Sequence, residues 1–109
     1  MIRLREGHLP EMNPAGLRLV DSHAHLQTKA FDSDRDEVLA AAYSAGLERI
    51  LVPGFDLPTT RAGLEFGRRH GLRTTVGIHP HLASSVGDAT WEAVRELARL
   101  DEVVGIGET

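Results

Sequence analysis

The chain has 109 residues, of which 41% are hydrophobic and 26% are charged, and its formal net charge is −4. This composition is ordinary for a globular domain, and the negative charge argues against a basic surface that holds nucleic acid through many phosphates. The sequence contains no cysteine, which excludes disulfides, thiolate zinc sites and cysteine nucleophiles, so any metal ion must be held by histidine and carboxylate groups.

The first 16 residues show no sustained hydrophobic period and are interrupted by Pro10, Pro14 and Gly16, so we expect an irregular leader there. This segment has no apolar signal core, and no stretch of the chain approaches the roughly 20 apolar residues that span a bilayer. We therefore expect a cytoplasmic protein without membrane association, with one domain over residues 17–109.

From residue 17 onward, hydrophobic runs alternate with segments of helical period. We predict strands at about 17–24, 49–52, 73–78 and 103–108, and helices at about 34–45, 57–69 and 89–100. Ser33, Asp56 and Asp88 are the predicted N-caps of the three helices, and Gly71 is the predicted stop of the second. The third helix has a predicted buried stripe at helical spacing, formed by Trp91, Val94, Leu97 and Ala98.

This βαβαβαβ order is typical of parallel strands joined by crossover helices. Two architectures fit it, a doubly wound sheet and the opening half of an eight-stranded barrel. A Rossmann-type sheet would carry a glycine-rich loop after its first strand, where this chain has Asp21-Ser22-His23-Ala24-His25. The reactive side chains instead follow the first, third and fourth strands, where barrels place their chemistry. We therefore predict an α/β fold that forms the first four strands of a TIM-type β/α barrel.

His23 and His25 are the first candidates for a functional site. Residues two apart in a strand face the same side, with Cα atoms about 6.6 Å apart, so both imidazoles can converge on one metal ion. Glu108 points inward if Ile106 belongs to the core, and a carboxylate inside a barrel needs a cation or hydrogen bonds. The spacing leaves ordinary alternatives open: packed or surface histidines, and an exposed or helix-capping glutamate.

His79 and His81 flank Pro80 after the third predicted strand. His79 directly follows Ile78 and could reach into the mouth of the site, where it would contact a substrate phosphate or polarise a leaving group. A loop histidine that is hydrogen-bonded to the backbone is an equal alternative at this position.

Four segments carry a further signal: residues 20–26 (VDSHAHL), 52–54 (VPG), 76–81 (VGIHPH) and 104–109 (VGIGET). Together, in this order and spacing, they resemble the TatD family of metal-dependent deoxyribonucleases. The resemblance implies that His23 and His25 are metal ligands, that Glu108 is the fourth-strand ligand and commonly bridges two ions, and that His79 faces the substrate phosphate. It also implies hydrolysis of phosphodiester bonds in DNA by a β/α barrel with two divalent ions, which are Mg²⁺, Mn²⁺ or Zn²⁺.

The family pattern continues past Glu108 with a Gly-Leu-Asp segment, two further histidines and a final aspartate, the expected partner of the attacking water. None of these is present in this sequence, so the resemblance covers the amino-terminal half of the barrel and assigns no general base.

Two other functions stay open. Related barrel hydrolases act on C–N or lactone bonds, and many of them bridge their metals with a modified lysine where this chain has Glu108. Alternatively, the chain is a catalytically inactive fragment that binds metal without turnover and self-associates through the open edges of its first and fourth strands.

Overall fold

The computed structural model describes residues 16–108, so the predicted leader lies outside the described residues except for Gly16. The principal elements are β1 (Leu19–Asp21), α1 (Arg35–Ser44), β2 (Leu47–Pro53), α2 (Leu57–His70), β3 (Arg73–Val76), α3 (Asp88–Leu97) and β4 (Val103–Ile106). Short 3₁₀ helices, η1 (Lys29–Phe31) and η2 (Pro80–Ser85), follow β1 and β3. None of the helices described is long and apolar enough to cross a membrane.

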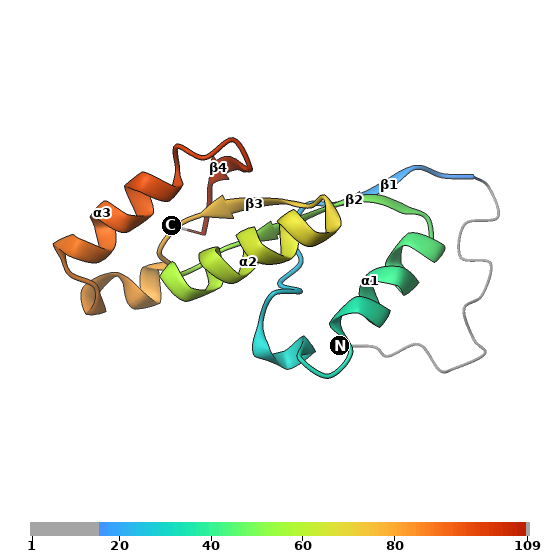
Figure 1. Ribbon diagram of the computed structural model, residues 1–109, viewed down its shortest axis with the longest axis horizontal. Coiled ribbons are helices and arrows are strands. Elements are labelled where there is room, and N and C mark those ends of the chain that lie inside the picture. Colours follow the sequence, from blue (N-terminus) through green and yellow to red (C-terminus); the bar gives the residue numbers. More distant parts are fainter. Residues whose placement is uncertain (1–15, 109) are drawn as a thin grey trace.

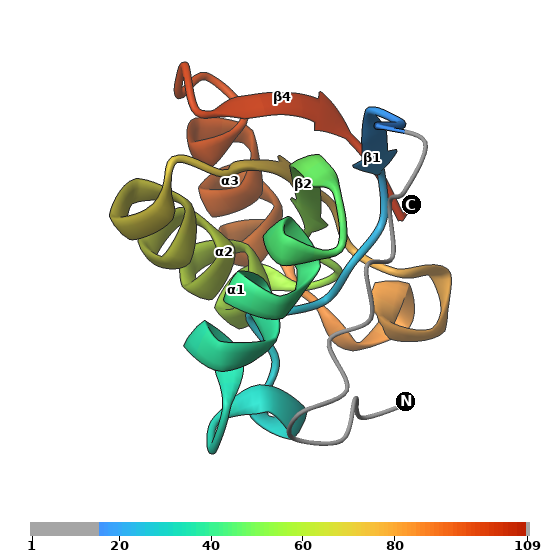
Figure 2. The ribbon, with the colours of Figure 1, turned by 90° about the vertical axis from the view of Figure 1, so that its right-hand side faces the viewer.

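The four strands are all parallel and lie in the order β1-β2-β3-β4. Each of the first three strands is followed by a crossover that carries an α-helix, and the three α-helices lie on one side of the sheet (Figures 1 and 2). The alternating α/β architecture predicted from the sequence is confirmed. The sheet is open, as expected for the first part of a barrel, because β1 and β4 are edges rather than partners of each other.

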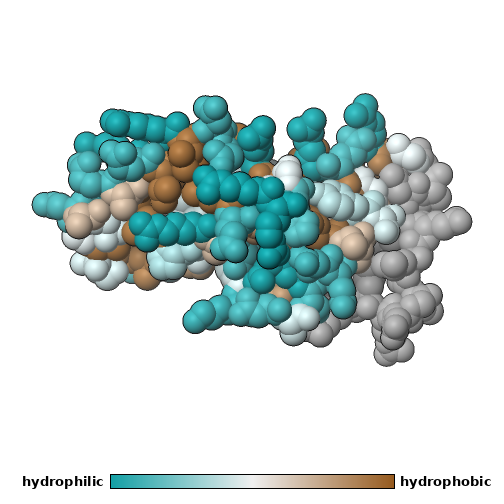
Figure 3. Space-filling view, viewed as in Figure 1, coloured by the Kyte–Doolittle hydropathy of each residue, from teal (hydrophilic) through white to brown (hydrophobic). Residues whose placement is uncertain are grey.

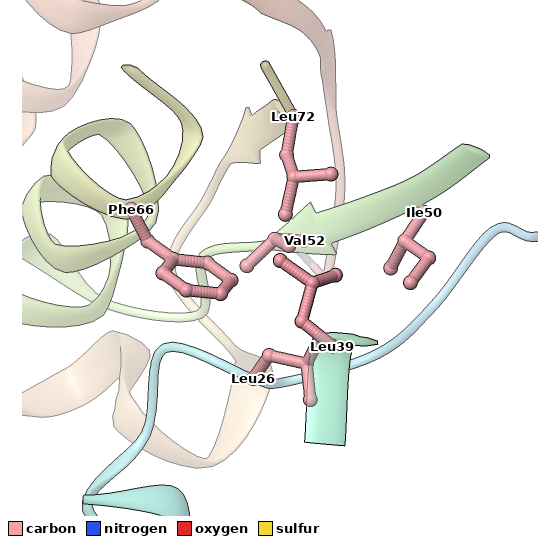
Figure 4. Close-up of a cluster of buried hydrophobic side chains, with 6 residues drawn as sticks. All are labelled: Leu26, Leu39, Ile50, Val52, Phe66 and Leu72. Atoms are coloured by element: carbon pink, nitrogen blue, oxygen red, sulfur yellow. The ribbon is translucent and has the colours of Figure 1, made fainter. Parts of the chain in front are cut away.

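Two hydrophobic clusters fill the space between the sheet and the helices. The larger joins β2 to α1 and α2, and consists of Leu26, Leu39, Ile50, Val52, Phe66 and Leu72 (Figure 4). The smaller lies under α3 and has Val76, Ile78 and Val94 as its buried members. Hydrophilic side chains cover much of the helix-bearing side around α2 (Figure 3).

Helix α2 begins and ends where the sequence predicts. The Asp56 carboxylate accepts a hydrogen bond from the Thr59 N–H while the Thr59 hydroxyl bonds back to the Asp56 backbone, which forms a capping box. Gly71 ends the helix with a left-handed φ of 71°. The other two caps were predicted one residue off, since α1 has Asp34 and α3 has Gly87 at the N-cap position.

The buried stripe predicted for α3 is wrong at one position. Trp91 is 40% exposed, whereas Val94 is buried and Leu97 and Ala98 pack against the smaller cluster. The contact between α3 and the sheet is therefore centred on the second half of the helix, and the Trp91 ring lies outside it.

The edge strands carry apolar side chains that remain exposed. On β1, Leu19 and Val20 are 41% and 63% exposed, and on β4, Val104 and Ile106 are 56% and 64% exposed. Glu108 was predicted to point inward on the condition that Ile106 belongs to the core, and that condition is not met among the described residues. The three helices cover the other side of the sheet, and Val104 and Ile106 of β4 remain largely exposed.

Candidate metal centre

His23, His25 and Glu108 converge at the carboxyl end of the sheet, although His23 and Glu108 are 85 positions apart in the chain. The Nε2 atom of His23 lies 2.9 Å from Oε1 of Glu108 and 3.1 Å from Nε2 of His25. The second carboxylate oxygen, Oε2, lies 3.3 Å from Nε2 of His25. One ligand atom from each residue therefore falls within a sphere that a single ion could occupy.

The two histidines reach this point by a turn rather than by strand alternation. Strand β1 ends at Asp21, whose carboxylate accepts a hydrogen bond of 2.9 Å from the His23 N–H and turns the backbone out of the ladder. The predicted strand over 17–24 is therefore too long. The Ala24 N–H still donates to the Leu51 carbonyl of β2, at 3.1 Å, which holds the turned segment against the sheet.

His25 is held in one tautomer by the end of β2. Its Nδ1 atom lies 3.0 Å from the carbonyl oxygen of Pro53, and a carbonyl can only accept, so Nδ1 carries the proton. In the neutral imidazole the Nε2 atom then presents a lone pair to the centre, which is the arrangement that metal-bound histidines adopt. The edge of the imidazole also packs against Phe55, with ring centroids 5.3 Å apart.

Glu108 reaches the histidines from beyond the end of β4. The strand ends at Ile106, the Gly107 N–H donates to the Val76 carbonyl at 3.1 Å, and Glu108 then takes a left-handed φ of 54°. Such a φ is uncommon for a residue with a side chain, and residues of this kind are enriched at functional sites. The strand predicted over 103–108 is thus two residues too long, and this backbone turn directs the carboxylate to the histidines.

The donor set fits a cation. Oε2 of Glu108 is buried and has no hydrogen-bond partner among the described residues, and it faces the unprotonated Nε2 of His25. Two acceptors at this distance repel each other unless a positive charge lies between them. Ligand atoms that each bind one ion at about 2 Å lie roughly 3 Å apart, as these do. Nitrogen and oxygen donors of this kind suit divalent transition metals and Mg²⁺.

A cavity of 370 Å³ opens beside the triad, and its walls are His25, Phe55, His79, His81, Leu82 and Glu108. His79 is fixed twice by the backbone, since its N–H donates to the Phe55 carbonyl at 2.8 Å and its Nδ1 accepts the His81 N–H at 3.1 Å. His79 is therefore hydrogen-bonded to the backbone, as one alternative predicted, and it also lines the cavity, where contact with a substrate phosphate stays a prediction. Because Nδ1 accepts, a neutral His79 carries its proton on Nε2.

Sequence reasoning missed three residues of this cavity, Phe55, His81 and Leu82. His81, on η2, received no role, yet its ring centroid lies 4.7 Å from that of His79. Phe55 was not singled out either, because nothing in the pattern after β2 distinguishes it from a core residue. The His-Pro-His spacing was the available signal for His81.

A sequence model of the family described as TatD related DNase matches residues 20–109 of this chain. The chain belongs to this family. Similar proteins include the 3'-5' ssDNA/RNA exonuclease TatD of Cronobacter turicensis, 38% identical over 91 residues, and that of Escherichia coli K12, 37% identical over 91 residues. The uncharacterized metal-dependent hydrolase YabD of Bacillus subtilis is 35% identical over 91 residues.

These alignments include 83% of this chain but only 35% to 36% of each relative, so the chain spans about a third of their length. Among solved structures, the TatD homologue YJJV of Escherichia coli K12 superposes with a TM-score of 0.76 at 26% identity. That likeness covers 85% of this chain and 37% of the YJJV chain. The predicted membership of the TatD family, restricted to its amino-terminal part, is confirmed.

Proposed function

We propose that this chain carries the amino-terminal half of a metal-dependent nuclease centre that hydrolyses phosphodiester bonds of DNA. The observation that supports it is the convergence of His23, His25 and Glu108 beside a cavity that His79 also lines. Relatives of similar sequence are named as exonucleases acting on single-stranded DNA and RNA. The same chemistry is therefore the first candidate for the protein to which this segment belongs.

In this proposal, His23, His25 and Glu108 are the metal ligands. A divalent ion bound there lowers the pKa of a bound water and neutralises charge that develops on phosphate oxygens. His79 binds the substrate, because its Nε2–H, which the Nδ1 contact with the His81 amide leaves as the free donor, can donate to a phosphate oxygen at the cavity. The described residues provide no group that we assign as the general base.

We propose that the centre would take two divalent ions, each Mg²⁺, Mn²⁺ or Zn²⁺, and that Glu108 would contribute a ligand to both. Its two oxygens lie near different histidines, Oε1 beside His23 and Oε2 beside His25, which supports a shared carboxylate. Isothermal titration with each metal measures stoichiometry and affinity. A single site per chain would support one ion, and no site for any of the three metals would remove the proposal.

Glu108 also bears on the second candidate, a barrel hydrolase acting on C–N or lactone bonds. A carboxylate at this position favours phosphoester chemistry over the enzymes that use a modified lysine there. A panel of single-stranded DNA, amide and lactone substrates, each assayed with Mn²⁺, separates the two, and turnover of only the amide or lactone would overturn the nuclease assignment.

The decisive test compares the parent chain with Glu108→Gln and with Trp91→Phe, a control at an exposed position away from the cavity. Metal affinity and cleavage of labelled single-stranded DNA are measured for each. We expect loss of metal binding in the Glu108 variant alone. A parent chain that binds Mn²⁺ but cleaves none of the substrates in the panel would support the alternative of an inactive fragment.

We further propose that the isolated chain self-associates through its edge strands. β1 and β4 are the two edges of the sheet formed by residues 16–108, and both carry exposed apolar side chains. Light scattering after gel filtration measures the molar mass, and a monomer at about 100 µM would contradict this proposal.

We also propose that the protein resides in the cytoplasm, which cell fractionation tests.

A further inference from the structure

Gln27 is buried next to the candidate metal centre without belonging to it. It lies in the segment between β1 and η1, and its side chain is only 6% exposed. The amide nitrogen, Nε2, donates to the Pro53 carbonyl at 2.7 Å and lies 3.5 Å from the Thr59 carbonyl of α2. Because both partners are carbonyls, the nitrogen and not the oxygen of the amide must face them.

The Pro53 carbonyl is the one that also fixes His25. It accepts from His25 Nδ1 at 3.0 Å and from Gln27 Nε2 at 2.7 Å, so both of its lone pairs are used. Pro53 itself is buried at the end of β2. The Gln27 amide therefore holds, from the other side, the acceptor that determines which nitrogen of His25 carries the proton.

Burying the Gln27 side chain lowers the stability of the folded chain, and packing alone does not explain why a polar residue lies there. The amide oxygen, Oε1, is buried and has no hydrogen-bond partner among the described residues. A buried acceptor left unpaired costs about 1–3 kcal/mol, which an apolar side chain of similar length would avoid. A polar residue that is unfavourable for packing points to a role for the group that is paired, Nε2.

We propose that Gln27 is a positioning residue of the candidate metal centre. Its amide nitrogen holds the Pro53 carbonyl so that His25 keeps its Nδ1–H tautomer and directs the Nε2 lone pair at the ion. This inference rests on the proposed function, because it takes His25 as a metal ligand. Groups that hydrogen-bond directly to a metal ligand typically contribute about 10–100-fold to metal affinity. Gln27 acts one contact further from the ion, so we expect its loss to weaken metal affinity by about 3–10-fold.

The test uses Gln27→Met, which keeps the length of the side chain and removes the donor. Its matched control is Thr74→Val, because Thr74 is also buried and its hydroxyl donates to the Val52 carbonyl at 2.5 Å, one residue before Pro53. Both variants remove a buried hydrogen bond to β2, but only Pro53 has a contact with a histidine of the triad. Where the methionine variant fails to fold, Gln27→Leu replaces it.

Two measurements are made, the affinity for Mn²⁺ by titration and the ¹⁵N shifts of the His25 ring in the metal-free protein. We expect Gln27→Met to weaken Mn²⁺ binding about 3–10-fold and to give a mixture of His25 tautomers, while Thr74→Val leaves both unchanged. Parent affinity together with an unchanged tautomer in Gln27→Met overturns the proposal. A parent chain that binds no metal defeats the proposed function, and the tautomer measurement then decides the role of Gln27 alone.

Discussion

Replacing Gly54 by alanine tests whether the end of β2 packs against α2 as closely as the structure shows. A Cβ at this position would lie 2.1 Å from the Thr60 hydroxyl oxygen and 2.7 Å from the Thr60 Cα atom. Thr60 is fully buried, and its hydroxyl donates to the Asp56 carbonyl at 2.7 Å, so it has no room to withdraw. Relief therefore requires the backbone of β2 or α2 to move.

The expected loss follows from the atoms involved. Overpacking of a well-filled core costs about 1–3 kcal/mol, and a clash that includes backbone belongs at the upper end, about 3 kcal/mol. Domains of this size are stable by only about 5–15 kcal/mol, so the change is readily measured. The movement also displaces the neighbouring Pro53 carbonyl, so we expect weaker Mn²⁺ binding in the same variant.

Urea unfolding followed by circular dichroism gives the free energy of unfolding, and Gly105→Ala serves as the matched control. At Gly105 the added Cβ would meet only the Thr75 Cγ2 atom, at 3.5 Å, which is an ordinary contact. Alanine there restricts the unfolded chain, so we expect no loss or a gain of up to about 1 kcal/mol. A Gly54→Ala protein within about 0.5 kcal/mol of the parent would refute the packing described for this strand end.

Three further predictions follow from contacts in the core, at η2 and on the surface. Leu39→Ala, at a 4% exposed core position, should lower the free energy of unfolding by about 2–5 kcal/mol, and Leu39→Met should lower it by less than about 1.5 kcal/mol. His79 Nδ1 caps η2 by accepting the His81 N–H, so His79→Ala should lower the free energy of unfolding by about 1 kcal/mol. His79→Asn keeps an acceptor at this position and should keep most of the stability. Both variants should lose DNA binding, and retained binding would exclude the phosphate contact. The hydrogen bond from Arg68 lowers the pKa of the Glu102 carboxyl in the folded protein. The ion pair therefore stabilises the fold fully above the unfolded-state pKa of about 4.3, and this stabilisation is lost as the pH falls through the folded-state pKa. Unfolding measured between pH 7 and pH 3 should show the parent and Glu102→Gln converging at the acid end.

Much of the fold could be predicted from the sequence because its signals are local. The capping box at Asp56 and the left-handed Gly71 fix both ends of α2 within neighbouring residues, so a single sequence suffices to place them. The exposure of Trp91 could not be predicted, because it depends on how far α3 extends past its contact with the smaller cluster. Helical spacing identifies a possible face of a helix but not the length over which that face is covered.

In the candidate site, too, the residues could be predicted from the sequence but their three-dimensional arrangement could not. Residue type and motif spacing indicated His23, His25 and Glu108, and the structure brings all three together. The means of convergence was not visible in the sequence, since it depends on the Asp21 carboxylate bonding the His23 amide and on the left-handed backbone at Glu108. The role of the Pro53 carbonyl likewise depends on contacts of His25 and Gln27 with the end of β2. The sequence does not indicate which backbone oxygen a given side chain will contact.

The distance along the chain between His23 and Glu108 has a consequence for assembly. An ion held by both residues would act as a removable cross-link between β1 and the end of β4, closing a loop of 85 positions. During synthesis these three ligands are present together only once residue 108 has emerged, directly after β4, so an ion could join the first described strand to the last only after all four had been synthesised.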